Sequence, residues 1–194
     1  GSLMREKKFS AAVVPLRRVT RERPDFPGGW RALAQCYRAR RQYERAVEAY
    51  EQAFALAPTP ELAYNLGVTA GRAGKWDRAV TAYDEALTLQ PAYGEAAYNR
   101  AVALMRGGEL SAAAEAFAAY RERDPDHYRA ALNHGVTLYK LGRYEEAVDV
   151  YNITLELKET PEAWDNLGLA YQKLGNEERA QACFREAKTM RGES

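Results

Sequence analysis

The chain has 194 residues, of which 46% are hydrophobic and 28% are charged, and its formal net charge at neutral pH is +1. No apolar run approaches the roughly 18 residues that a membrane-spanning helix needs, so we expect no membrane insertion. The two cysteines, Cys36 and Cys183, belong to no CxxC pair, which favours buried structural thiols in a reducing compartment, and we therefore expect a cytoplasmic protein.

A short sequence pattern returns every 33 or 34 residues along the chain. A ladder of small residues is spaced by 33, 34, 34 and 33 residues and consists of Ala34, Gly67, Ala101, Gly135 and Gly168. A second ladder, of alanines, has the same intervals and consists of Ala46, Ala79, Ala113, Ala147 and Ala180. Apolar and small residues recur three or four apart around both ladders, so each repeat is predicted to form two antiparallel helices.

The period divides the chain into one partial repeat and five full repeats. At the N-terminus, Phe9 and Ala12 match the second helix of a repeat, and Ala12 lies 34 residues before Ala46. Pro15 falls inside this segment, so we expect its helix to kink or to begin late, near Val14. The predicted boundaries are 3–26 for the partial repeat, which has the second helix only, then 27–59, 60–93, 94–127, 128–160 and 161–191 for the full repeats.

Glycine and proline mark the ends of the predicted helices. When the small residue of the first ladder is numbered position 8 of its repeat, position 15 is occupied by Gly74, Gly108, Gly142 and Gly175. Glycine adopts the left-handed conformation that commonly ends a helix without steric cost, whereas the first repeat has Arg41 there. The boundaries between repeats carry Pro58, Pro91 and Pro125, where a helix cannot continue. Thr59 and Thr160 each begin a Thr-Pro-Glu sequence, which predicts a helix N-cap.

These patterns resemble the tetratricopeptide repeat family. The signature of that family appears in the first and fifth repeats as Trp30-x2-Leu33-Ala34-x2-Tyr37 and Trp164-x2-Leu167-Gly168-x2-Tyr171. The resemblance covers almost the whole chain and implies an all-α fold, a right-handed superhelix (α-solenoid) of five helix-turn-helix repeats preceded by a partial repeat. The resemblance implies that the aromatic side chains pack between stacked repeats and do not form a cofactor site, so we expect no cofactor.

Position 6 of the first helix is asparagine in four consecutive repeats, and the residues are Asn65, Asn99, Asn133 and Asn166. An asparagine amide can both donate to and accept from a peptide group. The series is similar to the asparagine ladder in the repeat region of O-linked N-acetylglucosamine transferases, and this resemblance implies that the row holds the main chain of an extended peptide. The alternative is that these amides hydrogen-bond only to neighbouring helices.

The face of the first helices that carries the asparagines is the inner face of the superhelix in this family, so its other residues are expected to set affinity and selectivity. In the first repeat and at position 5 of the next two, these are Arg31, Gln35, Arg38, Tyr64 and Tyr98. The fourth repeat adds Arg129 and Tyr139. A basic row at position 13 consists of Arg72, Arg106, Lys140 and Lys173. A ligand would meet this row along one wall and an acidic row of Glu61, Glu95 and Glu162 along the other.

Two further positions bear on which ligand the inner face could bind. The carboxylate clamp of chaperone-binding members of the family needs two cations where this chain has Glu95 and Asn99, so we predict no dedicated clamp for a C-terminal carboxylate. Position 7, which is leucine in three repeats, is Arg100 and His134 in the others. We hypothesise that these two form a polar spot reachable from the groove, with His134 as a pH-sensitive contact between pH 5.5 and 7.5. The alternative is a surface-reaching arginine and a hydrogen-bonded, half-buried histidine.

The residues give no basis for catalysis, because the chain has two histidines and no HExxH, phosphate loop or grouped metal ligands.

Residues 1–41 contain eleven basic and three acidic residues, a net charge of +8, and the rest of the chain carries −7. This asymmetry favours an anionic partner or head-to-tail self-association, and without a nucleic-acid module we expect no nucleic-acid binding. Three roles stay open, namely a peptide-binding adaptor, a self-assembly element using the terminal repeats, and the substrate-recruiting region of a larger enzyme.

Overall fold

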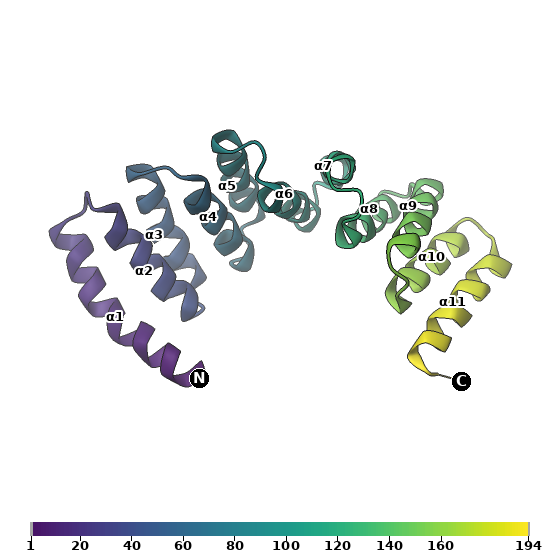
Figure 1. Ribbon diagram of the computed structural model, residues 1–194, viewed down its shortest axis with the longest axis horizontal. Helices are drawn as coiled ribbons and strands as arrows, with labels where there is room; N and C mark the ends of the chain where they lie inside the picture. Colours follow the sequence, from purple (N-terminus) through teal and green to yellow (C-terminus); the bar gives the residue numbers. More distant parts are fainter. Residues whose placement is uncertain (1, 194) are drawn as a thin grey trace. The chain divides into compact units, whose positions relative to one another are not determined.

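The computed structural model describes the backbone of residues 2–193 and the side chains of residues 11–193. Every regular element in this range is an α-helix (Figure 1), in agreement with the all-α prediction. The helices are α1 (Ser2–Glu22), α2 (Pro27–Ala39), α3 (Tyr43–Leu56), α4 (Pro60–Arg72), α5 (Trp76–Leu89), α6 (Gly94–Gly107), α7 (Leu110–Arg123), α8 (Tyr128–Lys140), α9 (Tyr144–Leu157), α10 (Pro161–Lys173) and α11 (Glu177–Arg191).

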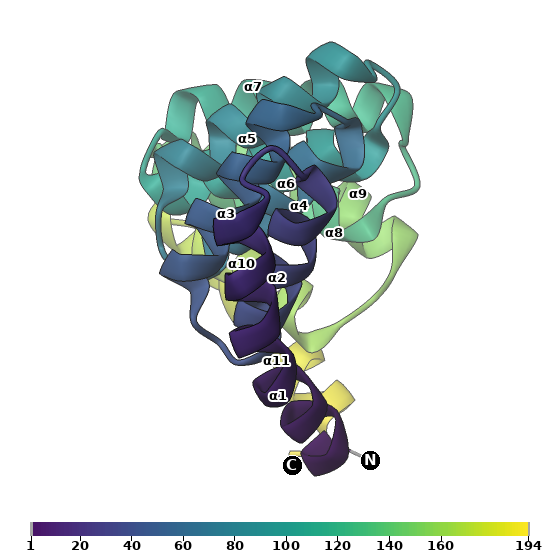
Figure 2. The ribbon, with the colours of Figure 1, turned by 90° about the vertical axis from the view of Figure 1, so that its left-hand side faces the viewer.

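The chain divides within α6 into two compact units, one ending at Ala103 and the other beginning at Leu104. In the first unit, α1 packs on α2, and each helix from α2 to α4 packs on the next (Figures 1 and 2). In the second unit, each helix from α7 to α10 packs on the one that follows it. Each unit buries its own cluster of alanine, leucine, valine and aromatic side chains, so each has a separate core.

The first helix differs from the sequence prediction. Because α1 begins at Ser2, the expected late start near Val14 is wrong. Pro15 lies inside the helix and cannot donate a backbone hydrogen bond, yet both Pro15 and Ala11 are exposed, so water can satisfy the carbonyl group of Ala11. The side chain of Phe9, which the sequence analysis assigned to this helix, lies outside the described residues.

The predicted helix ends are confirmed. Position 15 has positive φ angles of 73°, 92°, 77° and 74° at Gly74, Gly108, Gly142 and Gly175. Arg41 occupies the same left-handed region with φ 58°, although its side chain makes that conformation unfavourable. The hydroxyl groups of Thr59 and Thr160 each accept a hydrogen bond from the backbone N–H three residues later, at 3.2 Å, as N-caps do.

The ladder of small residues at position 8 has a steric reason. A Cβ atom on Gly135 would lie 2.5 Å from Cε1 of Tyr151, and one on Gly67 would lie 2.6 Å from Cε1 of Tyr83. Both distances are too short for a real contact. Glycine therefore allows the first helix of these repeats to rest directly on the aromatic ring of the second helix.

Candidate peptide-binding surface

Three of the predicted site residues meet at the C-terminal ends of α2 and α4. Gln35, Arg38 and Arg72 line one cavity of about 370 Å³ together with Ala39. Among the described residues, no carboxylate lies within ion-pair distance of either arginine. The cavity therefore offers two positive charges and one amide that an acidic group can approach.

Arg38 joins this cavity to the first asparagine of the series. Its Nη1 donates a hydrogen bond to Oδ1 of Asn65 at 2.9 Å. The Nδ2 atom of Asn65 donates to the carbonyl oxygen of Glu61, one turn earlier in α4, at 2.7 Å. An amide oxygen can accept two hydrogen bonds and an amide nitrogen can donate two, so the half-buried Asn65 keeps one further position on each atom.

Asn99 is also engaged within the protein. Its Nδ2 donates to the hydroxyl group of Tyr64 at 3.1 Å. The ring of Tyr64 packs against Tyr93 and Tyr83, with centroid distances of 5.1 and 5.9 Å. Burial raises the pKa of both Tyr93 and Tyr83, so the hydroxyl groups of these rings stay neutral. Tyr64 is therefore part of an aromatic cluster, and its hydroxyl group is hydrogen-bonded to Asn99.

The second unit places the other two asparagines in different surroundings. Asn133 is half-buried and interacts with other residues of the protein. Asn166 lines a cavity of about 550 Å³ with Glu162 and Asp165, and Asp165 forms an ion pair with Arg191. No side-chain hydrogen bond holds Asn166 within the described part of the chain, so its amide is open to a ligand.

The remaining predicted residues line neither of these two cavities. The side chains of this group are exposed and consist of Arg31, Arg106, Arg129, Lys140 and Lys173. Tyr98 is half-buried with partners in the protein, and Tyr139 packs edge-on against Tyr144 at a centroid distance of 5.3 Å. The basic row at position 13 lies in the last turn of α4, α6, α8 and α10, where a positive charge also stabilises the helix end.

The polar residues at position 7 each bond to the second helix of the preceding repeat. The Nε atom of Arg100 donates to Oδ1 of Asp84 at 2.5 Å, and Nη1 of Arg121 lies 3.1 Å from Nδ1 of His134. Burial, together with the charge of Arg121, lowers the pKa of His134 to about 4. The hypothesis of a pH-sensitive contact between pH 5.5 and 7.5 is therefore wrong, because the buried His134 is neutral over that whole range.

Comparison with known families and structures agrees with this architecture. Family models described as "Tetratricopeptide repeat" match residues 27–60, 64–126, 108–163 and 161–193. The chain belongs to the tetratricopeptide repeat family. Members of this family mediate protein–protein interactions and are generally not catalytic. A search among curated proteins finds no match to this sequence.

Solved tetratricopeptide structures share the fold. A "Crystal structure of MamA" has a TM-score of 0.77 at 22% identity and covers 82% of this chain and 95% of its own. "MamA 41-end from Desulfovibrio magneticus RS-1" has a TM-score of 0.78 at 20% identity, with coverages of 85% and 94%. "Crystal structure of YrrB: a TPR protein with an unusual peptide-binding site" has a TM-score of 0.73 at 19% identity, with coverages of 90% and 91%. These likenesses establish the tetratricopeptide fold alone.

Metal-ligand groups, membrane-spanning helices and free thiols were also considered among the described residues of this tetratricopeptide chain. No group of three or more His, Cys, Asp or Glu side chains in that part of the protein is arranged to hold a metal ion. None of its helices is long and apolar enough to cross a membrane. Cys36 and Cys183 are both buried and free, and burial raises the pKa of each thiol.

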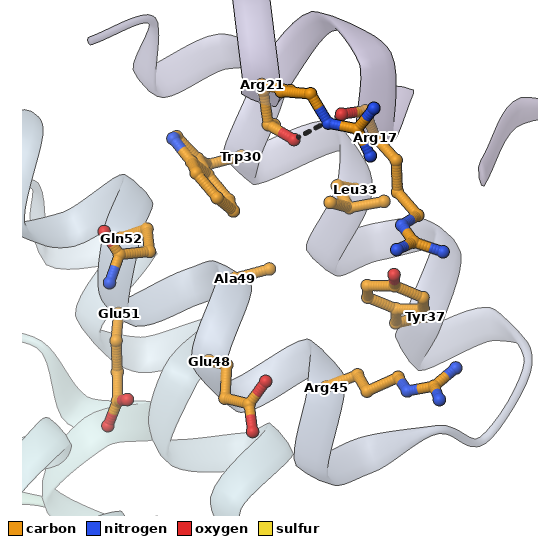
Figure 3. A pocket seen from close by; sticks show the side chains of 11 residues that line it. Arg17, Arg21, Trp30, Leu33, Tyr37, Arg45, Glu48, Ala49, Glu51 and Gln52 are labelled. Carbon is orange, nitrogen blue, oxygen red and sulfur yellow. Dashed lines mark hydrogen bonds between the residues drawn. The ribbon is translucent and has the colours of Figure 1, made fainter. Parts of the chain in front are cut away.

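One cavity was missed by the sequence analysis. A space of about 660 Å³ is bounded by α1, α2 and α3 of the first unit (Figure 3). Its lining includes Trp30, Leu33 and Tyr37, which the tetratricopeptide signature assigns to packing between repeats. The only signal in the sequence was the excess of arginine near the N-terminus, and that signal did not indicate where the charges gather.

Proposed function

We propose that this chain is a non-catalytic scaffold that holds an extended peptide segment against the inner face of the first helices of its repeats. The observation that carries the proposal is the cavity lined by Gln35, Arg38 and Arg72, in which neither arginine has a carboxylate partner among the described residues. One of the similar structures is described as having an unusual peptide-binding site, which supports the same kind of role here. The two buried free thiols favour a reducing compartment, and we place the protein in the cytoplasm.

The ligand that suits the first unit is a peptide with an acidic side chain. Its carboxylate would pair with Arg38 and Arg72, and its peptide groups would bond to Asn65 and Asn99. Hydrogen bonds to charged groups contribute about 1.5–3 kcal/mol net and neutral ones about 0.5–1.5 kcal/mol. Since both asparagines already bond within the protein, the arginines supply most of the affinity. Exposed charges are screened by salt, so binding should weaken as ionic strength rises.

Selection from a random peptide library displayed on phage, followed by calorimetry with the enriched peptides, tests this proposal. We expect the selected sequences to share an Asp or Glu. The double variants Arg38→Ala with Arg72→Ala, and Asn65→Ala with Asn99→Ala, should each weaken binding at least fivefold. Arg40→Ala, which removes an exposed arginine of the same region outside the cavity, is the matched control and should leave binding unchanged. Equal affinities for all variants would contradict the proposal.

Self-assembly through the terminal repeats is the second candidate. The uneven charge along the chain favours head-to-tail contacts between two copies. In the last repeat, three large apolar side chains are more than a third exposed, and these are Leu169, Leu174 and Met190. Sedimentation velocity over a hundredfold range of concentration tests this role, and a constant monomer would argue against it. The third role, recruitment of substrates to a larger enzyme, requires the sequence of the complete gene.

A further inference from the structure

The cavity between α1, α2 and α3 lies on a different face of α2 from the residues of the proposed peptide groove. Trp30, Leu33 and Tyr37 line this cavity, whereas Arg38 of the same helix lines the other one. With about 100° of rotation per residue in a helix, Trp30, Leu33 and Tyr37 point on average roughly 130° away from the groove residues Arg31, Gln35 and Arg38. The cavity is therefore a separate place on the protein, and a ligand there would leave the asparagine face free.

The floor of the cavity is apolar and rigidly held. Leu33 and Ala49 are almost fully buried, with 3% of each residue exposed. The indole N–H of the half-buried Trp30 donates to the carbonyl oxygen of Pro24 at 2.8 Å, which fixes the ring and leaves its remaining surface apolar. Figure 3 shows these side chains between the polar groups that α1 and α3 contribute. A large apolar side chain could rest on the accessible part of the Trp30 ring.

Three arginines surround the floor. Arg17 and Arg21 come from α1, and Arg45 comes from α3, where it lies 6.0 Å from the ring centroid of Tyr37. Within residues 11–193, none of these guanidinium groups has a carboxylate within ion-pair distance. Unpaired arginines at the edge of an aromatic pocket are suited to pair with carboxylates in a bidentate geometry.

The α3 side of the cavity, which contributes Arg45, also carries acceptor groups. Glu48 is exposed, and Glu51 pairs with Arg78 at 2.7 Å. Gln52 lies beside them, across the cavity from Arg17 and Arg45 (Figure 3). The carboxylate of Glu48 and the side-chain oxygen of Gln52 can accept hydrogen bonds from the N–H groups of a peptide main chain. The lining therefore offers cationic donors for carboxylates and acceptors for a main chain, which together suit a peptide ligand.

We propose that this cavity is a second protein-binding site, which takes an acidic peptide segment with a large apolar side chain at its centre. The apolar side chain rests on the accessible part of the Trp30 ring. Its flanking carboxylates pair with Arg17, Arg21 and Arg45, and its main chain meets the side of α3 that carries Glu48. The site is independent of the proposed function, because it uses none of the residues of the asparagine face.

The test uses a fluorescein-labelled peptide of about nine residues, in which Asp and Glu flank a central Phe-Leu pair, and follows its fluorescence anisotropy at low salt. We expect the double variant Arg17→Glu with Arg21→Glu to weaken binding at least tenfold. The matched control is Arg18→Glu with Arg40→Glu, which changes the net charge equally at exposed arginines outside the cavity, and its effect should be below twofold. A peptide with Asn and Gln in place of the acids should bind at least tenfold more weakly.

Three measurements keep the site distinguishable from the proposed groove. Arg38→Ala with Arg72→Ala should leave this peptide's affinity within twofold, and amide resonances of Thr20, Leu33 and Ala49 should shift on titration while those near Asn65 stay in place. Equal losses in both charge-reversal pairs, or a loss that follows Arg38 and Arg72, would overturn the assignment. So would a dimer of the unliganded chain that the Arg17→Glu with Arg21→Glu pair dissociates, because the occupant would then be a second copy.

Discussion

Arg121 donates a hydrogen bond to Nδ1 of His134 between α7 and α8. A guanidinium group has no acceptor, so Nδ1 must carry a lone pair, and the ring must be the neutral tautomer with its proton on Nε2. Protonation of His134 would break this bond and place two positive charges side by side in a buried site. Burial of the ring, and then the charge of Arg121, lower the pKa of His134 to about 4.

The first prediction concerns stability at mildly acidic pH. Because the folded-state pKa of His134 is about 4 and that of a free histidine about 6.5, the unfolded chain binds more protons between these values. Stability is therefore greatest above pH 6.5 and falls as the pH is lowered towards 4. From pH 7.5 to 5 we expect the free energy of unfolding to fall by about 2 kcal/mol from this group.

Urea denaturation at a series of pH values measures this effect. The double variant Arg121→Leu with His134→Leu should lose that part of the pH dependence, since leucine occupies the equivalent position in three repeats. His127 caps α8 by accepting a hydrogen bond from the N–H of Ala130 at 3.0 Å, so His127→Asn is the control that keeps His134 titrating. If the free energy of unfolding of the wild-type protein did not change between pH 7.5 and 5, the pKa assigned to His134 would be contradicted.

The second prediction concerns the contact between Gly135 and Tyr151. Gly135→Ala places a methyl group within 2.5 Å of the ring, and we expect overpacking to destabilise the protein by about 1–2 kcal/mol despite the better helix propensity of alanine. At Gly71 the same change meets Trp76 at 3.5 Å, an ordinary contact, and should stabilise the protein by up to about 1 kcal/mol. Thermal unfolding of both variants measures the difference, and equal shifts in the two would disprove the steric account.

The third prediction concerns the left-handed turn between α2 and α3. Arg41→Gly removes the steric cost of φ 58° and should stabilise the first unit by about 1 kcal/mol. The neighbouring Arg40 has φ −90°, so Arg40→Gly relieves no strain and should give no gain. Chemical denaturation of the two variants provides the comparison. A destabilised Arg41→Gly protein would mean that the arginine side chain contributes more than its backbone conformation costs.

The fourth prediction separates two threonine caps. Thr59 and Thr160 both cap a helix, but the hydroxyl group of Thr160 also lies 2.6 Å from that of Tyr128, the first residue of α8. Thr59→Ala should lower the free energy of unfolding by about 1 kcal/mol, and Thr160→Ala should lower it by about 1 kcal/mol more than that. A double-mutant cycle with Tyr128→Phe should assign that extra loss to the pair of hydroxyl groups. Absence of coupling in the cycle would leave the two caps equivalent.

The sequence predicts local features of this fold well, because they depend on residues close together in the chain. Glycine at position 15 and threonine before proline determine the ends of their helices without help from distant groups. Arg41 shows the limit of such reasoning. The turn after α2 keeps the left-handed conformation although its residue opposes it, because the helices on both sides fix the path of the chain.

Contacts between helices were much harder to predict. The unusual residues at position 7 were recognised, but their partners Asp84 and Arg121 depend on how one helix rests on the next. Likewise, the asparagine series was found by its period, while the bonds of Asn65 to Arg38 and of Asn99 to Tyr64 join neighbouring repeats. The cavity beside Trp30 was overlooked because the period alone does not indicate which side of a packing residue stays open.

Glycine at position 8 and the aromatic residue at position 24, as in Gly67 with Tyr83, couple the sequences of the two helices of a repeat. Where the first helix has alanine, as at Ala34, the aromatic residue at position 24 is Tyr50, and both residues are buried. Where it has glycine, the ring of Tyr83 or Tyr151 occupies that space. A crossover in the turn between the two helices of a repeat would therefore join an alanine to a ring that leaves it no room.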